Sequence, residues 1–433
     1  MRPIYYFLIP VTVVLTSFYL FPFSFVVLPG ANTKMIMAAF SLVILLVTLA
    51  RNRDANVGHS FIVLSLIAGV LSLICFMSVV INNTNDHSYS TYIVSMWVWL
   101  GGAYTLISVM KAVHKKVTVQ LICNYLIAVC VMQCIIALMI DLIPAVRYIV
   151  NTHIGSFGFN SSLGANEYER RDRLYGIGAA LDFAGTRFSA ILIMISVIIM
   201  QKANRPSIQT TLYIIAFVVI AVIGNMIART TTVGVVIALA YILVKVLKSS
   251  VIKYSRFVIA STVIVLGAVM LIISLYNSSI IFKEYIEFGF EGFFSLVRNG
   301  EWQTNSGDVL VNMIRFPETW KTWLIGDGYF ENPTSDMYYI GYQWKGFYMG
   351  TDIGYLRFIF YFGLIGLLVF VAFFCVVCKQ CSEKAPQYKA LFSLLLILNF
   401  IIWFKVSTDI FVVFAPFLCL LLDEDSIPDS LDV

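Results

Sequence analysis

Long apolar runs are the feature that most limits what this chain can fold into. Of its 433 residues, 60% are apolar and only 12% are charged, whereas a soluble domain carries roughly 25% charged residues. There are too few polar side chains to cover a soluble protein of this length, which excludes a cytosolic enzyme, a nucleic-acid-binding protein and a disordered chain. The runs are unbroken rather than alternating, and this favours membrane helices over an outer-membrane barrel.

About twelve such runs predict an all-α polytopic membrane protein, with residues 1–433 forming a single integral membrane domain. The first run begins at Ile4 and is long enough to span, so we interpret it as a retained helix rather than a cleaved signal peptide. The predicted spans are 4–28, 35–50, 61–81, 92–110, 117–140, 188–201, 211–228, 231–247, 257–276, 353–377, 390–404 and 410–422.

Lysine and arginine in alternate short loops predict the orientation of the spans. Five basic connections, together with Arg2, fall on one side of a twelve-span protein, and the positive-inside rule makes that side cytoplasmic. Both termini are then cytoplasmic. The opposite, external face holds two long loops, residues 141–187 and the larger 277–352.

Arginine is unevenly divided between the two predicted faces. The cytoplasmic face has ten Lys and five Arg, but the external face has five Lys and nine Arg. Arginine binds phosphate or carboxylate through a planar fork, so this bias predicts an anionic ligand on the external side. For any single arginine, the alternative is pairing with a nearby acid that holds the loops folded. The nine are Arg147, Arg170, Arg171, Arg173, Arg187, Arg229, Arg298, Arg315 and Arg357.

Two of these arginines lie close to the predicted membrane surface. Arg187 stands where the first external loop, with Gly176, Gly178 and Gly185, runs into a span; the glycines permit close approach of a ligand or form ordinary turns. Arg229 joins two apolar runs with almost no loop. A lone arginine at that depth costs a few kcal/mol unless it is paired or faces water. We expect Arg229 to point into a shared cavity, and snorkelling to the surface is the alternative.

The second external loop is rich in aromatic residues, since 18 of residues 277–352 are Phe, Tyr or Trp. Aromatic faces stack against sugar rings, and Tyr and Trp add hydrogen bonds. The pattern predicts a carbohydrate-binding loop, with packing inside a compact helical hairpin or an interfacial belt as the alternative. The candidate sugar platforms are Trp320, Trp323, Tyr342 and Trp344.

Conventional catalytic motifs do not occur in this sequence. It has no HExxH, no P-loop and no Ser/His/Asp arrangement, so we expect no cofactor and no metal, and catalysis would be metal-independent. Seven of the eight cysteines lie inside or beside apolar runs, where cysteine serves as a small buried hydrophobe.

Three features together resemble bacterial O-antigen and exopolysaccharide repeat-unit polymerases, within the wider O-antigen polymerase/ligase superfamily. The first is about twelve spans interrupted by two large external loops. The second is Ile227-Ala-Arg-Thr-Thr-Thr-Val-Gly234, which looks like the family's span junction. The third is the R-x10-G spacing from Arg315 to Gly326, followed by Asp352-Ile-Gly-Tyr-Leu at the start of the next span.

The resemblance implies a GT-C-like fold and a glycosyltransferase of the inner membrane. Such polymerases join polyprenyl-diphosphate-linked oligosaccharide repeats on the periplasmic side of the membrane. The partners implied are this lipid-linked substrate, membrane lipid, a flippase and a chain-length regulator, with no nucleic acid.

The leaving group of this reaction is a diphosphate, so fixed guanidinium groups would stabilise the charge that develops on it. We therefore predict that Arg187, Arg229 and Arg315 contact the diphosphate and that Arg173 and Arg357 assist in substrate binding. Asp182 and Asp352 are the predicted bases or Arg-orienting partners.

Two departures from the family pattern bear on the alternatives. The first loop lacks R-x10-G, because Arg173 and Gly185 are one residue further apart, and residues 277–352 contain no histidine of the kind that the ligases carry there. The second departure favours a polymerase over an O-antigen ligase. A lipid-linked oligosaccharide flippase or transporter is the non-enzyme alternative, although transporters often show repeated halves, which this chain lacks.

Overall fold

The structure is a computed structural model that describes residues 2–51, 58–155, 173–202, 207–248, 255–335, 339, 341–342, 344 and 346–420. Helices make up 78% of it, in agreement with the all-α prediction. The longer helices are α1 (Arg2–Leu20), α2 (Thr33–Arg51), α3 (His59–Asn82), α4 (Tyr92–His114), α5 (Val119–Leu142), α7 (Leu181–Lys202), α8 (Ile208–Ile227), α9 (Thr231–Leu247), α10 (Ser255–Ser278), α15 (Gly354–Lys384), α16 (Lys389–Ile402) and α17 (Phe411–Leu420).

Each predicted span coincides with one of these helices. By length and composition, eight helices are long and apolar enough to cross a membrane, namely α2, α3, α4, α5, α7, α8, α10 and α15. The apolar parts of α1, α9, α16 and α17 are shorter. The chain is therefore built as a helical membrane protein, and the twelve-span count stays a prediction.

Two predicted spans differ from the helices at their edges. The span predicted over 4–28 ends as helix at Leu20, because Pro22 lacks the backbone N–H that a helix needs. The chain then forms a small antiparallel sheet, β2-β1-β3, of Ser24–Phe25 (β1), Leu28–Asn32 (β2) and Ile154–Gly155 (β3). The span predicted from residue 188 begins as α7 at Leu181, seven residues earlier.

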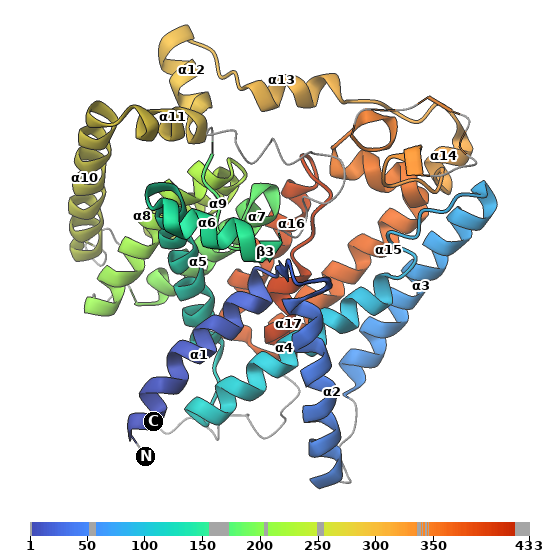
Figure 1. The fold of residues 1–433 in the computed structure, drawn as a ribbon, viewed down its shortest axis with the longest axis horizontal. Coiled ribbons are helices and arrows are strands. Elements are labelled where there is room, and N and C mark those ends of the chain that lie inside the picture. The colour runs from blue at the N-terminus through green and yellow to red at the C-terminus, as the bar shows by residue number, and fades with distance from the viewer. Residues whose placement is uncertain are drawn as a thin grey trace.

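Helix α7 forms the centre of the bundle. In its apolar window 94% of the residues are buried, compared with 17% for α2 and none for α10. α7 packs against α5, α8, α9 and α16, whereas α10 stands at the left edge of the molecule (Figure 1). An apolar helix as exposed as α10 is stable in contact with lipid, which supports the membrane assignment.

The segment between α10 and α15, which we call the external segment, forms short helices that lie across one end of the bundle, along the top of Figure 1. We call this end the loop end; it is the end that the sequence predicts to be external. Hydroxyls of Ser279, Thr304 and Thr319 each accept a backbone N–H at the start of a helix, which is the usual capping arrangement. These helices are α11 (Ile280–Gly289), α12 (Glu291–Asn299), α13 (Asn305–Asn312) and α14 (Trp320–Leu324).

Shorter elements complete the described fold. They are α6 (Pro144–His153) and the 3-10 turns η3 (Pro333–Ser335), η4 (Tyr348–Gly350) and η5 (Pro386–Tyr388). Helix α15 is kinked at Gly363, whose φ is +68°. The kink leaves room for the chain after α14, because a Cβ on Gly363 would overlap the backbone of Leu324 and Ile325.

Candidate functional site

The break between α8 and α9 packs directly against α7 and places Arg229 at the loop end. The Ser189 hydroxyl donates to the Thr230 carbonyl (2.9 Å) and accepts from the Gly234 N–H (3.1 Å). The absence of side chains at Gly185 and Gly234 permits this contact, since a Cβ on either would collide with the neighbouring helix. Gly185 and Gly234 thus serve helix packing, which is neither of the two roles, ligand approach or an ordinary turn, that the sequence analysis considered for Gly185.

Asp182 joins three separate parts of the chain at the start of α7. Its Oδ1 accepts hydrogen bonds from the Thr230 hydroxyl and from the Lys405 ammonium, the latter at 2.9 Å. Lys405 Nζ also lies 3.0 Å from Thr230 Oγ1. Asp182 and Lys405 are each about one-third exposed, so this network lies at the boundary between the packed interior and accessible space.

Arg229 is held by the segment above it, and its side chain remains 20% exposed. Its Nη1 forms an ion pair with Glu291 and donates to Ser306 Oγ (3.2 Å), and its Nε donates to the Phe288 carbonyl (2.9 Å). The guanidinium also stacks on the Phe288 ring, 4.2 Å from its centroid. Arg229 is thus paired. Pairing, like contact with water, lowers the cost of an arginine at this depth.

Arg173 lies beside Arg229 and stacks on the same Phe288 ring, 5.2 Å from its centroid. Its charge acts on both Arg229 and Asp182. The side chain is exposed, and it has no salt bridge to any residue that the structure describes. Arg173 is therefore a cation that a ligand can reach, next to a second cation already fixed in place.

Arg357 forms a buried clamp next to this group. It donates to Ser407 Oγ (2.8 Å) and lies 3.3 Å from a Glu331 carboxylate oxygen and 3.8 Å from one of Asp352. Its guanidinium also stacks on the Phe330 ring, 3.7 Å from the centroid. With its side chain only 5% exposed, Arg357 is an internal tie between α15, the α16–α17 connection and the external segment.

The pKa of the Asp352 carboxyl departs from its ordinary value. Burial raises the pKa of its carboxyl to about 6, against the opposing effect of Arg357. The charges of Asp182 and Lys405 also act on it, which links the Arg357 clamp to the Asp182 network. A carboxyl with this pKa that remains partly exposed can take up or release a proton near neutral pH.

We refer to Arg173, Asp182, Arg229, Asp352 and Lys405 as the outer cluster. It unites four residues predicted from the sequence, Arg173, Asp182, Arg229 and Asp352, with one that the sequence analysis did not select, Lys405. The only signal for Lys405 was the polar stretch Lys405-Val-Ser-Thr-Asp409 between two apolar runs. Glu291 and Glu331 were also missed, because nothing in a loop sequence says which acid will meet which arginine.

Arg315 and the predicted sugar platforms lie in a different part of the external segment. Arg315 stacks on Trp344, 4.8 Å from its ring centroid, and Tyr342 packs edge-on against the same indole at 4.6 Å. Trp320 and Tyr342 are 82% and 71% exposed. Trp323 instead packs within the loop, stacking on Phe316 and donating its indole N–H to a backbone carbonyl.

Arg187 faces away from the outer cluster. Gly185 and Ser189 contact the α8–α9 break, and Arg187 is two residues from each, about 200° around the helix. Its guanidinium lies 5.5 Å from the centroid of the Phe21 ring. The arginines predicted to share one diphosphate are therefore distributed over three places, around Arg229, Arg187 and Arg315.

Ion pairing sorts the external arginines into two groups. Each member of the first group pairs with an acid, as the alternative interpretation for single arginines expects: Arg147 with Asp141, Arg229 with Glu291, Arg298 with Glu287, and Arg357 with Glu331. The second group, Arg173, Arg187 and Arg315, makes no ion pair within the described part of the chain. Arg170 and Arg171 lie outside the described residues. The second group holds the arginines whose charge no acid of the described structure offsets through an ion pair.

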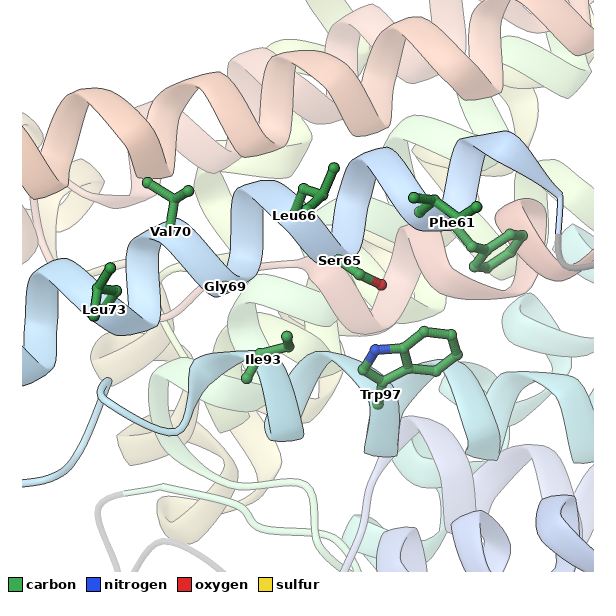
Figure 2. A pocket seen from close by; sticks show the side chains of 9 residues that line it. Phe61, Ser65, Leu66, Gly69, Val70, Leu73, Ile93 and Trp97 are labelled. Atoms are coloured by element: carbon green, nitrogen blue, oxygen red, sulfur yellow. The ribbon is translucent and has the colours of Figure 1, made fainter.

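A separate apolar groove of about 510 Å³ lies between α3 and α4. Figure 2 shows Ser65 pointing toward Trp97 across it. The other lining side chains are Phe61, Ile62, Leu66, Val70, Leu73 and Ile93. No charged residue is among those that line this groove, and its apolar lining suits hydrocarbon chains.

Among the residues that the structure describes, no group of three or more His, Cys, Asp or Glu side chains is placed to hold a metal ion. The chain matches no protein-family model, no curated protein and no solved structure.

Proposed function

We propose that this chain is a metal-independent glycosyltransferase that polymerises polyprenyl-diphosphate-linked oligosaccharide repeats on the periplasmic face of the bacterial inner membrane. The observation that carries the proposal is the position of Arg173, an exposed guanidinium without an ion pair among the described residues, beside Arg229 and within electrostatic reach of Asp182. Two neighbouring guanidinium groups suit the negative charge that develops on a diphosphate leaving group. The resemblance of the segments around Arg229 and Arg315 to polymerase motifs supports the same activity.

In the proposed step, the bond between the anomeric carbon of the growing chain and its diphosphate oxygen breaks. The bonding electrons leave with the diphosphate, and Arg173 and Arg229 stabilise the resulting charge. A hydroxyl of the incoming repeat forms the new glycosidic bond, and its proton passes to Asp352. The pKa of about 6 of this carboxyl suits a general base that works near neutral pH.

Some of the other predicted residues fit around this step, whereas Arg187, Arg357 and Trp323 take no part in it. Lys405 holds Asp182 in an ion pair, so that Asp182 stays near Arg173 without forming an ion pair with it. Tyr342, Trp344 and the exposed Trp320 offer aromatic faces for the sugars, with Arg315 stacked on Trp344. The donor arrives already activated by its lipid diphosphate, so the proposal includes no nucleotide cofactor. A flippase that delivers the repeats and a chain-length regulator are the partners that this activity implies.

The test is polymer formation by the purified protein in liposomes that contain the lipid-linked repeat. We expect Arg173→Ala and Arg229→Ala to abolish the ladder of products on a gel. Arg298→Ala is the matched control, because Arg298 belongs to the same external segment, pairs with Glu287 (2.6 Å) and is not a member of the outer cluster. Full-length polymer from both site variants would refute the proposal.

The same preparation separates the alternatives. An O-antigen ligase would transfer the glycan to added lipid A core and leave lipid-linked repeats unjoined. A flippase would move the repeats across the bilayer without forming any glycosidic bond.

A further inference from the structure

Phe288 contacts two arginines of the outer cluster at once. The guanidinium carbon of Arg229 lies 4.2 Å from the centroid of the Phe288 ring, and that of Arg173 lies 5.2 Å from the same centroid. Arg173 precedes α7 and Arg229 lies in the α8–α9 break, so the end of α11 joins two segments that carry the same charge. The proposed reaction uses both arginines and assigns no role to this ring.

Two guanidinium groups that share one ring repel each other. Their separation cannot exceed the two ring distances taken together, which is less than the Debye length of about 10 Å at 0.1 M salt. Salt therefore screens the repulsion only in part, and the charge of Arg173 acts on Arg229. The pair needs a contact that holds it together before any ligand binds.

An aromatic ring can supply that contact without changing the charge of the pair. The face of the ring attracts a cation through its quadrupole and adds no net charge. Glu291, in contrast, offsets the charge of Arg229 in an ion pair. A second acid beside Arg173 would hold this arginine as well, but it would compete with an anionic ligand. Phe288 contacts both arginines and leaves their net charge unchanged.

The backbone around Phe288 holds the ring in place. The Phe288 carbonyl accepts a hydrogen bond from Arg229 Nε (2.9 Å), so this residue contacts one guanidinium through both its ring and its backbone. The next residue, Gly289, packs on the end of α8, where a Cβ would lie 3.1 Å from the helix backbone. In the preceding turn, the Tyr285 hydroxyl donates to Asp141 (2.7 Å). The end of α11 is thus anchored to α5 and α8.

We propose that Phe288 is a positioning residue that holds Arg173 and Arg229 together as one anion-binding pair. The inference rests on the proposed function, because it assigns the pair to the diphosphate of the lipid-linked donor. It deepens that function by making the strength of the pair depend on the π face of residue 288 and not only on its apolar bulk. The ring itself takes no part in bond making or breaking.

The test changes the charge distribution of the ring while nearly keeping its size. Phe288 is replaced by trifluorophenylalanine, in which fluorine withdraws electrons from the face that attracts cations, and separately by Leu and by Tyr. Calorimetry measures the binding of inorganic diphosphate to each purified protein in a maltoside detergent that contains no phosphate. The double variant Arg173→Gln with Arg229→Gln gives the background from other cations. Polymer formation is measured in parallel in liposomes that contain the lipid-linked repeat.

We expect trifluorophenylalanine and Phe288→Leu to weaken diphosphate binding about 3- to 30-fold, the range that corresponds to cation–π energies. Phe288→Tyr keeps the π face and should bind nearly as well as the parent protein. Phe294→Leu is the matched control, because Arg298 lies over the Phe294 ring at 5.1 Å in the same external segment. This control should leave diphosphate binding unchanged.

Equal affinity of the parent protein and the trifluorophenylalanine variant would overturn the inference. Absence of diphosphate binding by the parent protein above the background of the double variant would overturn it as well. If Phe288→Leu does not fold, the fluorinated protein and Phe288→Tyr decide the question, since both keep the ring.

The polymer assay separates this inference from the proposed function. Polymer from the parent protein together with unchanged binding in the fluorinated variant would remove the role of Phe288 and leave the proposed function intact. Binding in the expected order without any polymer from the parent protein would support the pairing of the two arginines by Phe288 and refute the proposed function.

Discussion

Lys405 and Asp182 are 223 positions apart in the chain, yet Lys405 Nζ lies 2.9 Å from Asp182 Oδ1. This bond ties the α16–α17 connection to the start of the central helix α7. The Thr230 hydroxyl, from the α8–α9 break, donates to Asp182 and accepts from Lys405. These polar contacts join three segments of the chain at the base of the outer cluster.

Replacing Lys405 with Met should weaken the contacts that hold these three segments together. The Asp182 carboxylate would lose its cation, and we expect the protein to lose about 1–2 kcal/mol of stability along with most of its polymer-forming activity. Thermal unfolding in detergent and the liposome assay measure the two effects.

The double variant Lys405→Met with Asp182→Asn tests whether the two residues act as a pair. Coupled residues are not additive, so the double variant should be less destabilised than the sum of the single ones. Additive losses would show that the contact contributes nothing to stability.

The R-x10-G spacing has a structural basis at its glycine. Gly326 has φ +86°, and a Cβ there would lie 2.6 Å from the Tyr361 carbonyl. We expect Gly326→Ala to displace the chain after α14 and to lower both stability and activity. The thermal midpoint and the polymer ladder are the measurements.

Gly300 provides the matched control for Gly326. Its φ is +76°, but a Cβ at this position meets nothing within 4 Å. Gly300→Ala therefore carries only the backbone strain, about 1–2 kcal/mol, without the collision. Equal effects of the two substitutions would mean that the close contact with Tyr361 is unimportant.

The positions of the helices were predictable, because hydropathy is a property of consecutive residues. The start of α7 was not, since Asp182 and Arg187 interrupt the apolar run and made it seem to begin at residue 188. Asp182 is tolerated there through Thr230 and Lys405, which are 48 and 223 positions away. A sequence read along the chain carries no record of such partners.

Distant partners also explain why the sequence could not show which arginines are available to a ligand. Their number on the external face could be counted, but which of them are neutralised depends on Glu287, Glu291 and Glu331 meeting them in space. Arg173 ranked below Arg229 in the sequence analysis, yet Arg229 pairs with Glu291 whereas Arg173 makes no ion pair within the described structure. The available cations are therefore a property of the fold and not of the motif.

The tryptophans of the external segment should separate into structural and binding residues. Trp323 stacks on Phe316 and donates its indole N–H to the Pro317 carbonyl (3.0 Å), so Trp323→Ala should lower the thermal midpoint. Trp320 is 82% exposed, and Trp320→Ala should leave the midpoint unchanged.

If Trp320 contacts sugars, its alanine variant should instead raise the substrate concentration needed for half-maximal rate, by about 5- to 150-fold for a stacking contact of 1–3 kcal/mol. Tyr342→Ala should behave in the same way. A normal substrate dependence in both variants would remove these residues from the predicted sugar platforms.

The proposed base predicts how activity depends on pH. Asp352 accepts a proton only when its carboxyl is ionised, and burial raises its pKa to about 6. Activity should therefore rise with pH from 5 to 7, by roughly tenfold as the ionised fraction grows, and level off above. Asp352→Asn should lower the rate about 100-fold or more and flatten the acidic part of the pH profile.

Asp308→Asn is the control for this variant. Asp308 is an exposed acid of the same segment, and its replacement should leave both the rate and the pH profile unchanged. A pH profile in Asp352→Asn identical to that of the parent protein would show that another group accepts the proton.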